Sequence, residues 1–222
     1  IQRETYLGTW LPEPILTEAQ SDLTNPAQHA TIYDTISMAF MVMIEQLTPA
    51  ERAVFLLREI FDYDYDEIGD IIGKKEVSCR KIFSRAKGHI QANRPRFDSQ
   101  PDQHKLLLQQ FIVTVQKGDV DGFVTMLADD VTLMADGGGT RGAAIHILKG
   151  SNPVSKFVIG ITNKTPLHDL KFGLEQVNEQ WAIVIRSATG HPFNVIMIDT
   201  MDSKIQCIYT VAGEQKLKGL VI

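Results

Sequence analysis

The chain has 222 residues, a formal net charge of −5 and an apolar share of 44%. These values suit two small folded domains and exclude a chain that is disordered throughout. No apolar run reaches the roughly 18 to 20 residues that span a bilayer, so we expect a cytoplasmic protein without a membrane partner. Cys79 and Cys207 lie far apart in unrelated patterns, so no disulfide, metal site or cofactor is expected.

Residues 1–33 are expected to form an extended segment and linker, because they contain three prolines and no sustained helical period. Within them, the run Trp10-Leu11-Pro12-Glu13-Pro14 places a large ring and a leucine ahead of two prolines. The prolines remove amide donors and favour an extended backbone. Such a segment is suited to lie against another surface, and an ordinary linker with one exposed Trp is the alternative.

Residues 34–47 carry apolar side chains at steps of three and four, which predicts one apolar helical face. Thr48-Pro49-Ala50-Glu51 then supplies an N-cap hydroxyl, a proline at the first helical position and a glutamate at the third. This pattern predicts a second helix that continues toward Asp62. The residues expected to be buried on these two helices are Ile36, Phe40, Met43, Ile44, Leu47, Val54, Phe55, Leu57 and Ile60.

A short helix from about Asp66 is predicted to end at Gly73, because glycine takes the left-handed cap at little cost. A last helix is predicted from about Glu76 to Ile90. The residues expected to be buried on these two helices are Ile68, Ile71, Ile72, Val77, Ile82, Phe83, Ala86 and Ile90.

The charge changes sign at Gly73. Residues 34–70 hold nine acidic and two basic side chains, whereas residues 74–96 hold eight basic side chains and one acid. A short acidic helix, a glycine turn and a basic helix are typical of a DNA-binding helix-turn-helix. A plain helical bundle with a solvated basic face is the alternative. The residues expected to contact DNA are Lys74, Lys75, Ser78, Arg80, Lys81, Arg85 and Lys87.

The second half of the chain predicts an α+β domain. A helix is expected from Gln103 to Lys117 and a shorter one from Val120 to Leu127, with a break at Gly118. Runs rich in β-branched and aromatic residues predict strands, and a helix from about Pro153 to Ile161 interrupts them. The predicted strands are 131–134, 143–148, 170–177, 181–186, 195–199 and 205–211.

Acidic residues near the first predicted strand raise the question of an enzyme. Asp129, Asp130 or Asp136 could act as a general base, with His146 or His168 as its partner. Acids that flank a strand are also common turn formers, and no spacing fixes a second catalytic group. The glycine run after Asp136 lacks the lysine and the strand-to-helix setting of a phosphate-binding loop. Trp181 and His191-Pro192 are interpreted as core and loop residues.

Four stretches of the first half resemble region 4 of the extracytoplasmic-function RNA polymerase sigma factors. They are residues 47–59 (LTPAERAVFLLRE), 65–69 (YDEIG), 79–81 (CRK) and 84–87 (SRAK). The resemblance implies that this part of the chain reads the −35 element of a promoter and that its partners are promoter DNA and the RNA polymerase core.

Two further motifs resemble those of the SigJ-like subgroup, whose members carry a fused C-terminal SnoaL-like domain. They are Trp10-Leu11-Pro12-Glu13-Pro14 and Asp136-Gly137-Gly138-Gly139-Thr140. The resemblance implies that both motifs are regulatory contact points. Here the glycine run ends in Thr140 where the subgroup usually has lysine, and Gly213-Glu214-Gln215-Lys216-Leu217 replaces a second signature, so the contacts of that loop are left open.

The expected architecture is multidomain. An all-α helix-turn-helix (residues 34–96) follows the linker (1–33) and precedes a SnoaL-like cone with a curved antiparallel sheet (100–222). Nothing before Ile1 corresponds to sigma region 2, so we expect a fragment of an alternative sigma factor. We expect no enzyme activity, and the resemblance implies an intramolecular contact with region 2 in the full-length protein. The alternative is a small-molecule enzyme of isomerase or cyclase type, or a ligand sensor, tethered to a DNA-binding domain.

Overall fold

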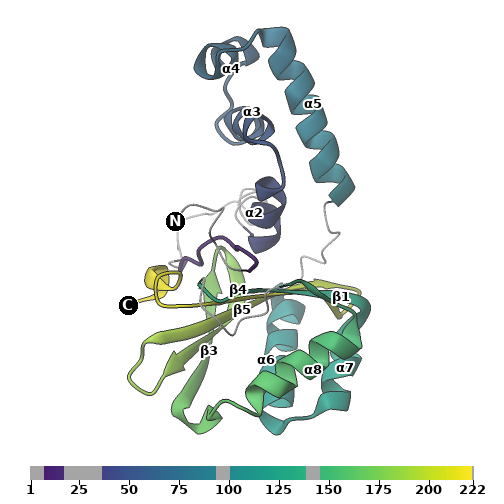
Figure 1. Cartoon of the computed structure of the whole chain (residues 1–222), viewed down its shortest axis with the longest axis vertical. Helices are drawn as coiled ribbons and strands as arrows, with labels where there is room; N and C mark the ends of the chain where they lie inside the picture. The colour runs from purple at the N-terminus through teal and green to yellow at the C-terminus, as the bar shows by residue number, and fades with distance from the viewer. Residues whose placement is uncertain (1–7, 18–36, 94–100, 139–145, 222) are drawn as a thin grey trace. The chain divides into compact units, whose positions relative to one another are not determined.

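The computed structural model describes residues 8–17, 37–93, 101–138 and 146–221 (Figure 1). Contacts divide the chain into two compact units. The helical unit spans residues 39–95, and the α+β unit combines residues 96–222 with those up to Met38. Among the described helices, none is long and apolar enough to cross a membrane.

The helical unit contains α2 (Met38–Glu45), α3 (Pro49–Glu59), α4 (Tyr65–Ile72) and α5 (Glu76–Asn93). Thr48 caps α3 as predicted, since its hydroxyl accepts from the Glu51 amide and the Glu51 carboxylate accepts from the Thr48 amide at 3.1 Å. Gly73 ends α4 in the left-handed conformation, with φ of 66°. The predicted turn between α4 and α5 is therefore present.

Two apolar clusters hold the helices together. Phe55, Ala86 and Ile90 pack with α2, while Val54, Ile68, Cys79 and Ile82 join α3, α4 and α5. The prediction was wrong for three core residues: Ile60, Ile71 and Val77 are exposed to 38%, 55% and 64%. A short helix buries only a narrow stripe, and Ile60 lies just past the end of α3, so apolar spacing overestimates the buried set.

The α+β unit begins with α6 (Pro101–Lys117) and α7 (Val120–Met126), followed by β1 (Leu127–Asp136), β2 (Leu148–Lys149) and α8 (Ser151–Thr162). A short 3-10 helix, η2 (Leu167–Asp169), leads into β3 (Leu170–Val177), β4 (Gln180–Ser187), β5 (Pro192–Met201) and β6 (Lys204–Ala212). A second 3-10 helix, η3 (Lys218–Leu220), follows the last strand.

The six strands form one curved sheet in the order β2-β1-β6-β5-β4-β3 (Figure 1). The sheet is mixed and not wholly antiparallel, because β1 runs parallel to β6, with Leu133 opposite Ile208. Strand propensity predicts that a strand exists but not which distant strand it pairs with. In the predicted strand 143–148, only Leu148 is in β2; Ala143 to Ile145 lie outside the described residues.

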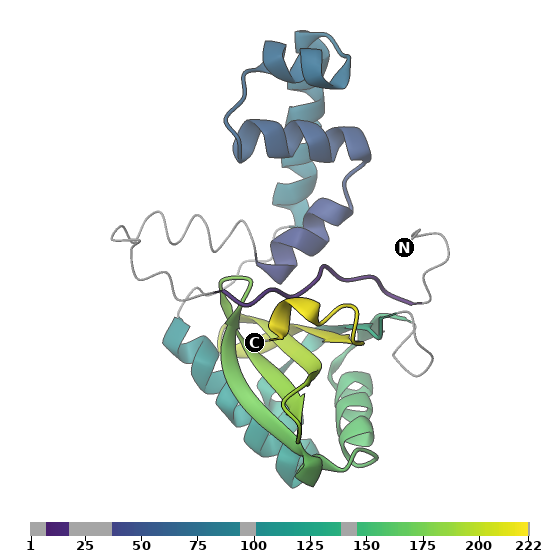
Figure 2. The same ribbon diagram turned by 90° about the vertical axis from the view of Figure 1, so that its left-hand side faces the viewer.

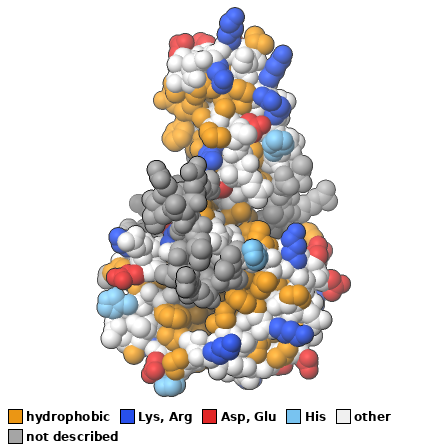
Figure 3. All heavy atoms as spheres, in the orientation of Figure 1, with side chains coloured by type: hydrophobic (Ala, Val, Ile, Leu, Met, Phe, Trp, Pro, Cys, Tyr) orange, Lys and Arg blue, Asp and Glu red, His pale blue; other side chains and the backbone are white. Residues whose placement is uncertain are grey.

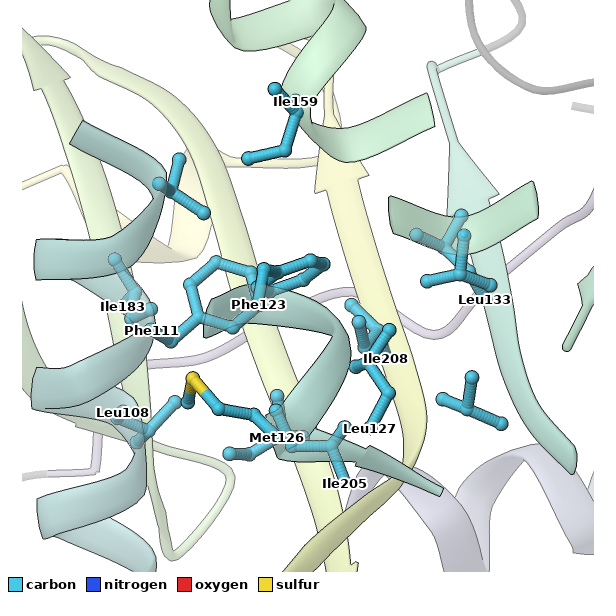
Figure 4. Packing of buried hydrophobic residues seen from close by; sticks show 14 of the residues in the cluster. Leu108, Phe111, Phe123, Met126, Leu127, Leu133, Ile159, Ile183, Ile205 and Ile208 are labelled. Carbon is cyan, nitrogen blue, oxygen red and sulfur yellow. The ribbon is translucent and has the colours of Figure 1, made fainter. Parts of the chain in front are cut away.

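Helices α6, α7 and α8 cover one face of this sheet, and the main core lies between them (Figure 4). Phe111 of α6 and Phe123 of α7 meet edge to face, with ring centroids 5.1 Å apart. On β1 and β6, Leu133 and Ile208 point into this core, so by strand alternation Asp136 and Tyr209 belong to the opposite face. The two faces of the sheet therefore carry different chemistry.

Candidate nucleic-acid interface and segment-docking site

The exposed side of α5 and the turn before it carry the basic residues predicted to contact DNA. All seven of these residues are exposed, and Figure 3 shows Lys and Arg side chains gathered along the α5 side of the helical unit. Cys79, Ile82, Ala86 and Ile90 occupy the buried side of the helix. At 100° per residue, Ser78, Lys81 and Arg85 then share one edge of the exposed side, and Arg80 and Lys87 share the other.

Arg80 is already engaged within the helical unit. Its guanidinium donates to the Glu76 carboxylate at 2.7 and 3.0 Å and lies 4.5 Å from the centroid of the Tyr65 ring. The hydrogen bond to Glu76 raises the pKa of Arg80 above its ordinary value. The Glu76 carboxylate and the Tyr65 ring therefore orient the guanidinium, although both partners of the ion pair are well exposed to solvent.

Val77 is a residue of this surface that the sequence reasoning placed in the core. It lies in the first turn of α5 and is 64% exposed, next to Ser78. The N-terminal residues of a recognition helix meet base edges, and an apolar side chain there can contact the methyl group of thymine. The helical period of α5, counted from Cys79 and Ile82, would have revealed its exposure.

The motif Trp10-Leu11-Pro12-Glu13-Pro14 is docked on the sheet face away from the three helices (Figure 2). The Leu11 amide donates to Oδ2 of Asp136 at 2.7 Å, and the Lys216 ammonium donates to the Leu11 carbonyl. Lys216 Nζ also lies 3.1 Å from Oδ2 of Asp136. One buried ion pair thus satisfies both main-chain groups of Leu11. We call Leu11, Asp136 and Lys216 the clamp.

The Trp10 ring and the two prolines of the motif complete this contact. The Trp10 ring stacks on the clamp, with Lys216 Nζ 4.1 Å from its centroid. Leu11, Pro12 and Pro14 are buried, whereas Glu13 is exposed. The side chains of the clamp ion pair are only 4% and 0% exposed, so a desolvated cation lies between a carboxylate and an aromatic face.

The segment continues along the β3–β4 hairpin and the C-terminal turn. The Thr17 amide donates to the Gln176 carbonyl at 2.9 Å, and the Asn178 amide donates to the Ile15 carbonyl at 2.9 Å. The Leu16 amide donates to the Gly219 carbonyl at 3.3 Å. Because the segment adds main-chain hydrogen bonds on both sides, it is held as an irregular extra strand.

Two glycines allow close main-chain approach beside the clamp. The Gly138 amide donates to Oδ1 of Asp136 at 2.9 Å, which forms the turn after β1. A Cβ atom on Gly138 would lie 3.1 Å from the Ala212 carbonyl and 3.2 Å from Cα of Gly213. The turn after β1 therefore packs directly on the turn that leads to Lys216. Gly139 and Thr140 of the same motif lie outside the described residues.

Lys216 is the clamp residue that sequence reasoning left open. It belongs to the loop 213–217, whose contacts were in doubt because the subgroup's signature is replaced there. Lys216 is the one basic residue of residues 213–217, and this was the signal that could have identified it. Its partner Leu11 is 205 residues away in sequence, so no local pattern connects them.

A cavity of about 100 Å³ lies between α6, α8 and the sheet, on the other face from the clamp. None of the described residues that line it is acidic, basic or a histidine. Asp129 and Asp130 are exposed on β1, His146 and His168 are exposed, and Asp136 belongs to the clamp. The structure therefore does not bring the five candidate acid–base residues together.

One buried carboxyl group belongs neither to the basic surface of α5 nor to the clamp. Asp199 of β5 is buried beside Cys207 and Tyr209 of β6, and burial raises the pKa of its carboxyl to about 7. Its Oδ2 atom has no hydrogen-bond partner among the described residues. Burial also raises the pKa of the Cys207 thiol to about 12, so this cysteine is protonated and unreactive as a nucleophile near neutral pH.

Comparison with known proteins supports both units. Residues 37–90 match the family model for sigma-70, region 4, which spans α2 to α5 up to Ile90. The ECF RNA polymerase sigma factor SigJ of Mycobacterium tuberculosis is 32% identical over 164 residues, which cover 73% of this chain and 52% of that protein. The probable ECF RNA polymerase sigma factor SigI of the same species is 34% identical over 110 residues, 50% of this chain and 38% of that protein.

The crystal structure of Mycobacterium tuberculosis SigJ superposes with a TM-score of 0.73 at 26% identity. The match covers 97% of this chain and 76% of that one. Together these findings define a region 4 helix-turn-helix joined to a SnoaL-like α+β domain. The chain therefore contains a sigma-70 region 4 and is similar over most of its length to the extracytoplasmic-function sigma factor SigJ. It spans about half the length of the curated relative SigJ.

Proposed function

We propose that this chain is the promoter-reading and regulatory part of an alternative sigma factor that acts in transcription initiation in the cytoplasm. The observation that supports this proposal most directly is the exposed basic side of α5. This helix follows the Gly73 turn and lies almost wholly within the residues that match sigma-70 region 4. In this proposal α5 enters the major groove of the −35 element and the RNA polymerase core is the protein partner. No catalytic step is proposed, because no acid or base lines the described cavity.

The residues of α5 divide into two roles in this proposal. Val77, Ser78 and Lys81 lie near the start of the helix and face base edges, together with Arg80 once it leaves Glu76. Lys74, Lys75, Arg85 and Lys87 contact phosphates, which fix the register without reading sequence. Lys87 lies 3.7 Å from Glu59, and this exposed pair is weak enough to exchange for a phosphate.

Arg80→Ala tests the assignment of base reading. We expect it to cost about 1 to 3 kcal/mol of binding to the cognate −35 duplex. Arg80→Lys keeps the charge but loses the planar fork, so it should recover nonspecific binding and not discrimination between bases. Lys156→Ala, which removes an exposed cation from α8, is the control for net charge. Fluorescence anisotropy with cognate and scrambled duplexes measures both the affinity for the −35 element and the discrimination between sequences. Unchanged cognate binding by Arg80→Ala would remove Arg80 from the residues proposed to read bases.

We further propose that the clamp makes the SnoaL-like domain a regulator of the DNA-binding part. The motif around Trp10 lies on the same stretch of chain that leads to the helical unit, and the clamp ties it to the α+β unit. A docked segment restricts the chain between the two units, which would favour a compact state. In the complete protein, this restriction is proposed to act together with a contact to sigma region 2.

Promoter-driven transcription by the complete protein tests this regulation. Trp10→Ala removes the ring that covers Lys216 and should change the output, because the segment is then less firmly docked. Ile15→Ala is the matched control, since this residue belongs to the same segment but its side chain is 61% exposed. If Trp10→Ala and Ile15→Ala give the same output as the unaltered protein, at equal protein levels, the regulatory role is refuted.

A further inference from the structure

The exposed side of α5 has a middle line between the two edges that carry its basic residues. At about 100° per residue, Val77, Ser84 and Gly88 fall on this line, directly opposite the buried side of the helix. All three are exposed. A recognition helix in the major groove turns the middle of its exposed side toward the groove floor, where the base edges lie. These three positions are therefore the ones that face the bases most directly.

Val77 is the apolar side chain of this line, and its exposed fraction is 64%. Among residues 74–91, all of which the structure describes, every other exposed side chain is charged or polar, apart from the glycine at 88. A single exposed apolar residue is ordinary on a protein surface. This one, however, lies in the middle of a basic surface, and its β-branched side chain is also a weaker helix former than alanine or lysine. The fold itself gives no reason for a valine here.

The major groove presents one apolar group that a valine can recognise. Each A·T pair carries the C5-methyl group of thymine on its major-groove edge, whereas the other features of the base edges are hydrogen-bond donors and acceptors. Contact between Val77 and this methyl group would remove both from water, which is favourable. Against a donor or acceptor, the same valine would leave a polar group without a partner, which is costly.

The rest of the middle line leaves room for a close approach. Ser84 has a short side chain and Gly88 has none, so neither would hold the helix away from the groove floor. A Cβ atom added to Gly88 would meet no atom of the chain within 4 Å. The packing of the protein therefore does not require glycine at this position, although glycine is less favourable than alanine inside a helix.

We propose that Val77 is a specificity-determining residue that recognises a thymine of the −35 element through its C5-methyl group. The inference rests on the proposed function, since it requires α5 to lie in the major groove. It adds the identity of one base and the group by which that base is recognised. Val77 supplies an apolar contact and no charge, so it affects the choice between bases more than the affinity for DNA in general.

Modified duplexes test this contact at the level of one methyl group. Selection from a randomised duplex pool with the unaltered chain gives a preferred sequence, and each thymine in it is then replaced singly by deoxyuridine, which lacks only the methyl group. We expect one of these replacements to lower affinity about fourfold, the usual worth of burying one methylene-sized group. 5-Bromodeoxyuridine at the same position should restore the affinity, because bromine is close in size to a methyl group. Fluorescence anisotropy measures each affinity.

Two variants assign the effect to Val77. Val77→Ala should bind the thymine and deoxyuridine duplexes equally, with about the affinity that the unaltered chain has for the deoxyuridine duplex. Alanine is a better helix former than valine, so α5 should remain intact in this variant. Val113→Ala is the matched control, because it makes the same change on α6, where Val113 is 48% exposed. This control should keep the fourfold difference.

Three outcomes overturn the proposal. The first is a preferred duplex in which no single deoxyuridine replacement lowers the affinity. The second is a loss on replacement that is as large in Val77→Ala as in the unaltered chain. The third is a loss that 5-bromodeoxyuridine does not reverse. If the chain preferred no duplex sequence over any other, the proposed function would fail and this inference with it, so the two failures are distinguishable.

Discussion

The helical unit and the α+β unit place their important side chains in opposite settings. The basic residues of α5 and its preceding turn fall within 14 consecutive residues, 74–87, and all are exposed. The clamp joins Leu11 to residues 125 and 205 positions away, and its ion pair is almost fully buried. The first arrangement suits a surface that must exchange partners, and the second suits a contact that must hold a segment in place.

The two ion pairs Arg80–Glu76 and Lys216–Asp136 show this difference directly. The N–O distances are similar, 2.7 and 3.1 Å, but the side chains of the first pair are 59% and 47% exposed. An exposed pair contributes about 0 to 1 kcal/mol and can be replaced by DNA phosphate. Removing only one partner of a buried pair lowers stability by several kcal/mol, because the other charge is left in the interior.

The largest expected effect is that of Lys216→Met, which keeps the length of the side chain but removes the cation beside the buried Asp136 carboxylate. We expect the free energy of unfolding to fall by about 3 to 5 kcal/mol. Urea denaturation followed by circular dichroism measures it. Lys218→Met, an exposed lysine of the same C-terminal turn, should change stability little. Adding Asp136→Asn to Lys216→Met should restore part of the loss; equal losses in the Lys216 and Lys218 variants would contradict the clamp.

The next effect is a pH dependence that originates from Asp199. Burial raises the pKa of this carboxyl to about 7 in the folded chain, against about 3.9 in an unfolded chain. The folded state therefore binds an extra proton between about pH 4 and 7. The contribution of this group to stability falls as the pH rises through that window and is constant above it.

Asp199→Asn should remove this dependence. The neutral amide cannot ionise, so the stability of the variant relative to the unaltered chain should rise by a few kcal/mol between about pH 4 and 7. Urea midpoints at several pH values measure the difference. Asp202→Asn, the same change at an exposed position of the β5–β6 turn, is the matched control. A stability difference between the Asp199→Asn variant and the unaltered chain that does not vary with pH would exclude the proposed titration of Asp199.

The same contrast explains what the sequence could and could not predict. Thr48 and Glu51 cap a helix three residues apart, and Gly73 ends one, so local chemistry sufficed for the helix-turn-helix. The parallel pairing of β1 with β6 has no local pattern, because it depends on which distant strands meet. Asp136 was weighed as a general base because a carboxylate beside a strand does not reveal whether its partner is solvent, substrate or a buried lysine.

The clamp was only partly predictable, because it too depends on which residues that are distant in sequence meet. The Trp10 motif and the turn after Asp136 were expected to be contact points, although not with each other. Lys216 was not expected, since burial of a lysine depends on the groups that surround it in three dimensions. Sequence therefore predicts exposed charge patterns better than it predicts paired buried charges.

The smallest expected effect is local to the helical unit. Thr48→Ala removes the hydroxyl that caps α3 and should lower the stability of the unit by about 1 kcal/mol, whereas Thr48→Ser keeps the cap and should change it little. The hydrogen bonds from Thr48 also lower the pKa of Glu51 in the folded chain. Their contribution to stability is therefore present above the pKa that glutamate has in the unfolded chain, and it is lost as the pH falls through the lower pKa of the folded chain. Thermal unfolding near pH 7 and near pH 3 should thus show a larger Ala–Ser difference at the higher pH. A difference independent of pH would mean that the hydroxyl acts through the Glu51 amide alone and not through the carboxylate.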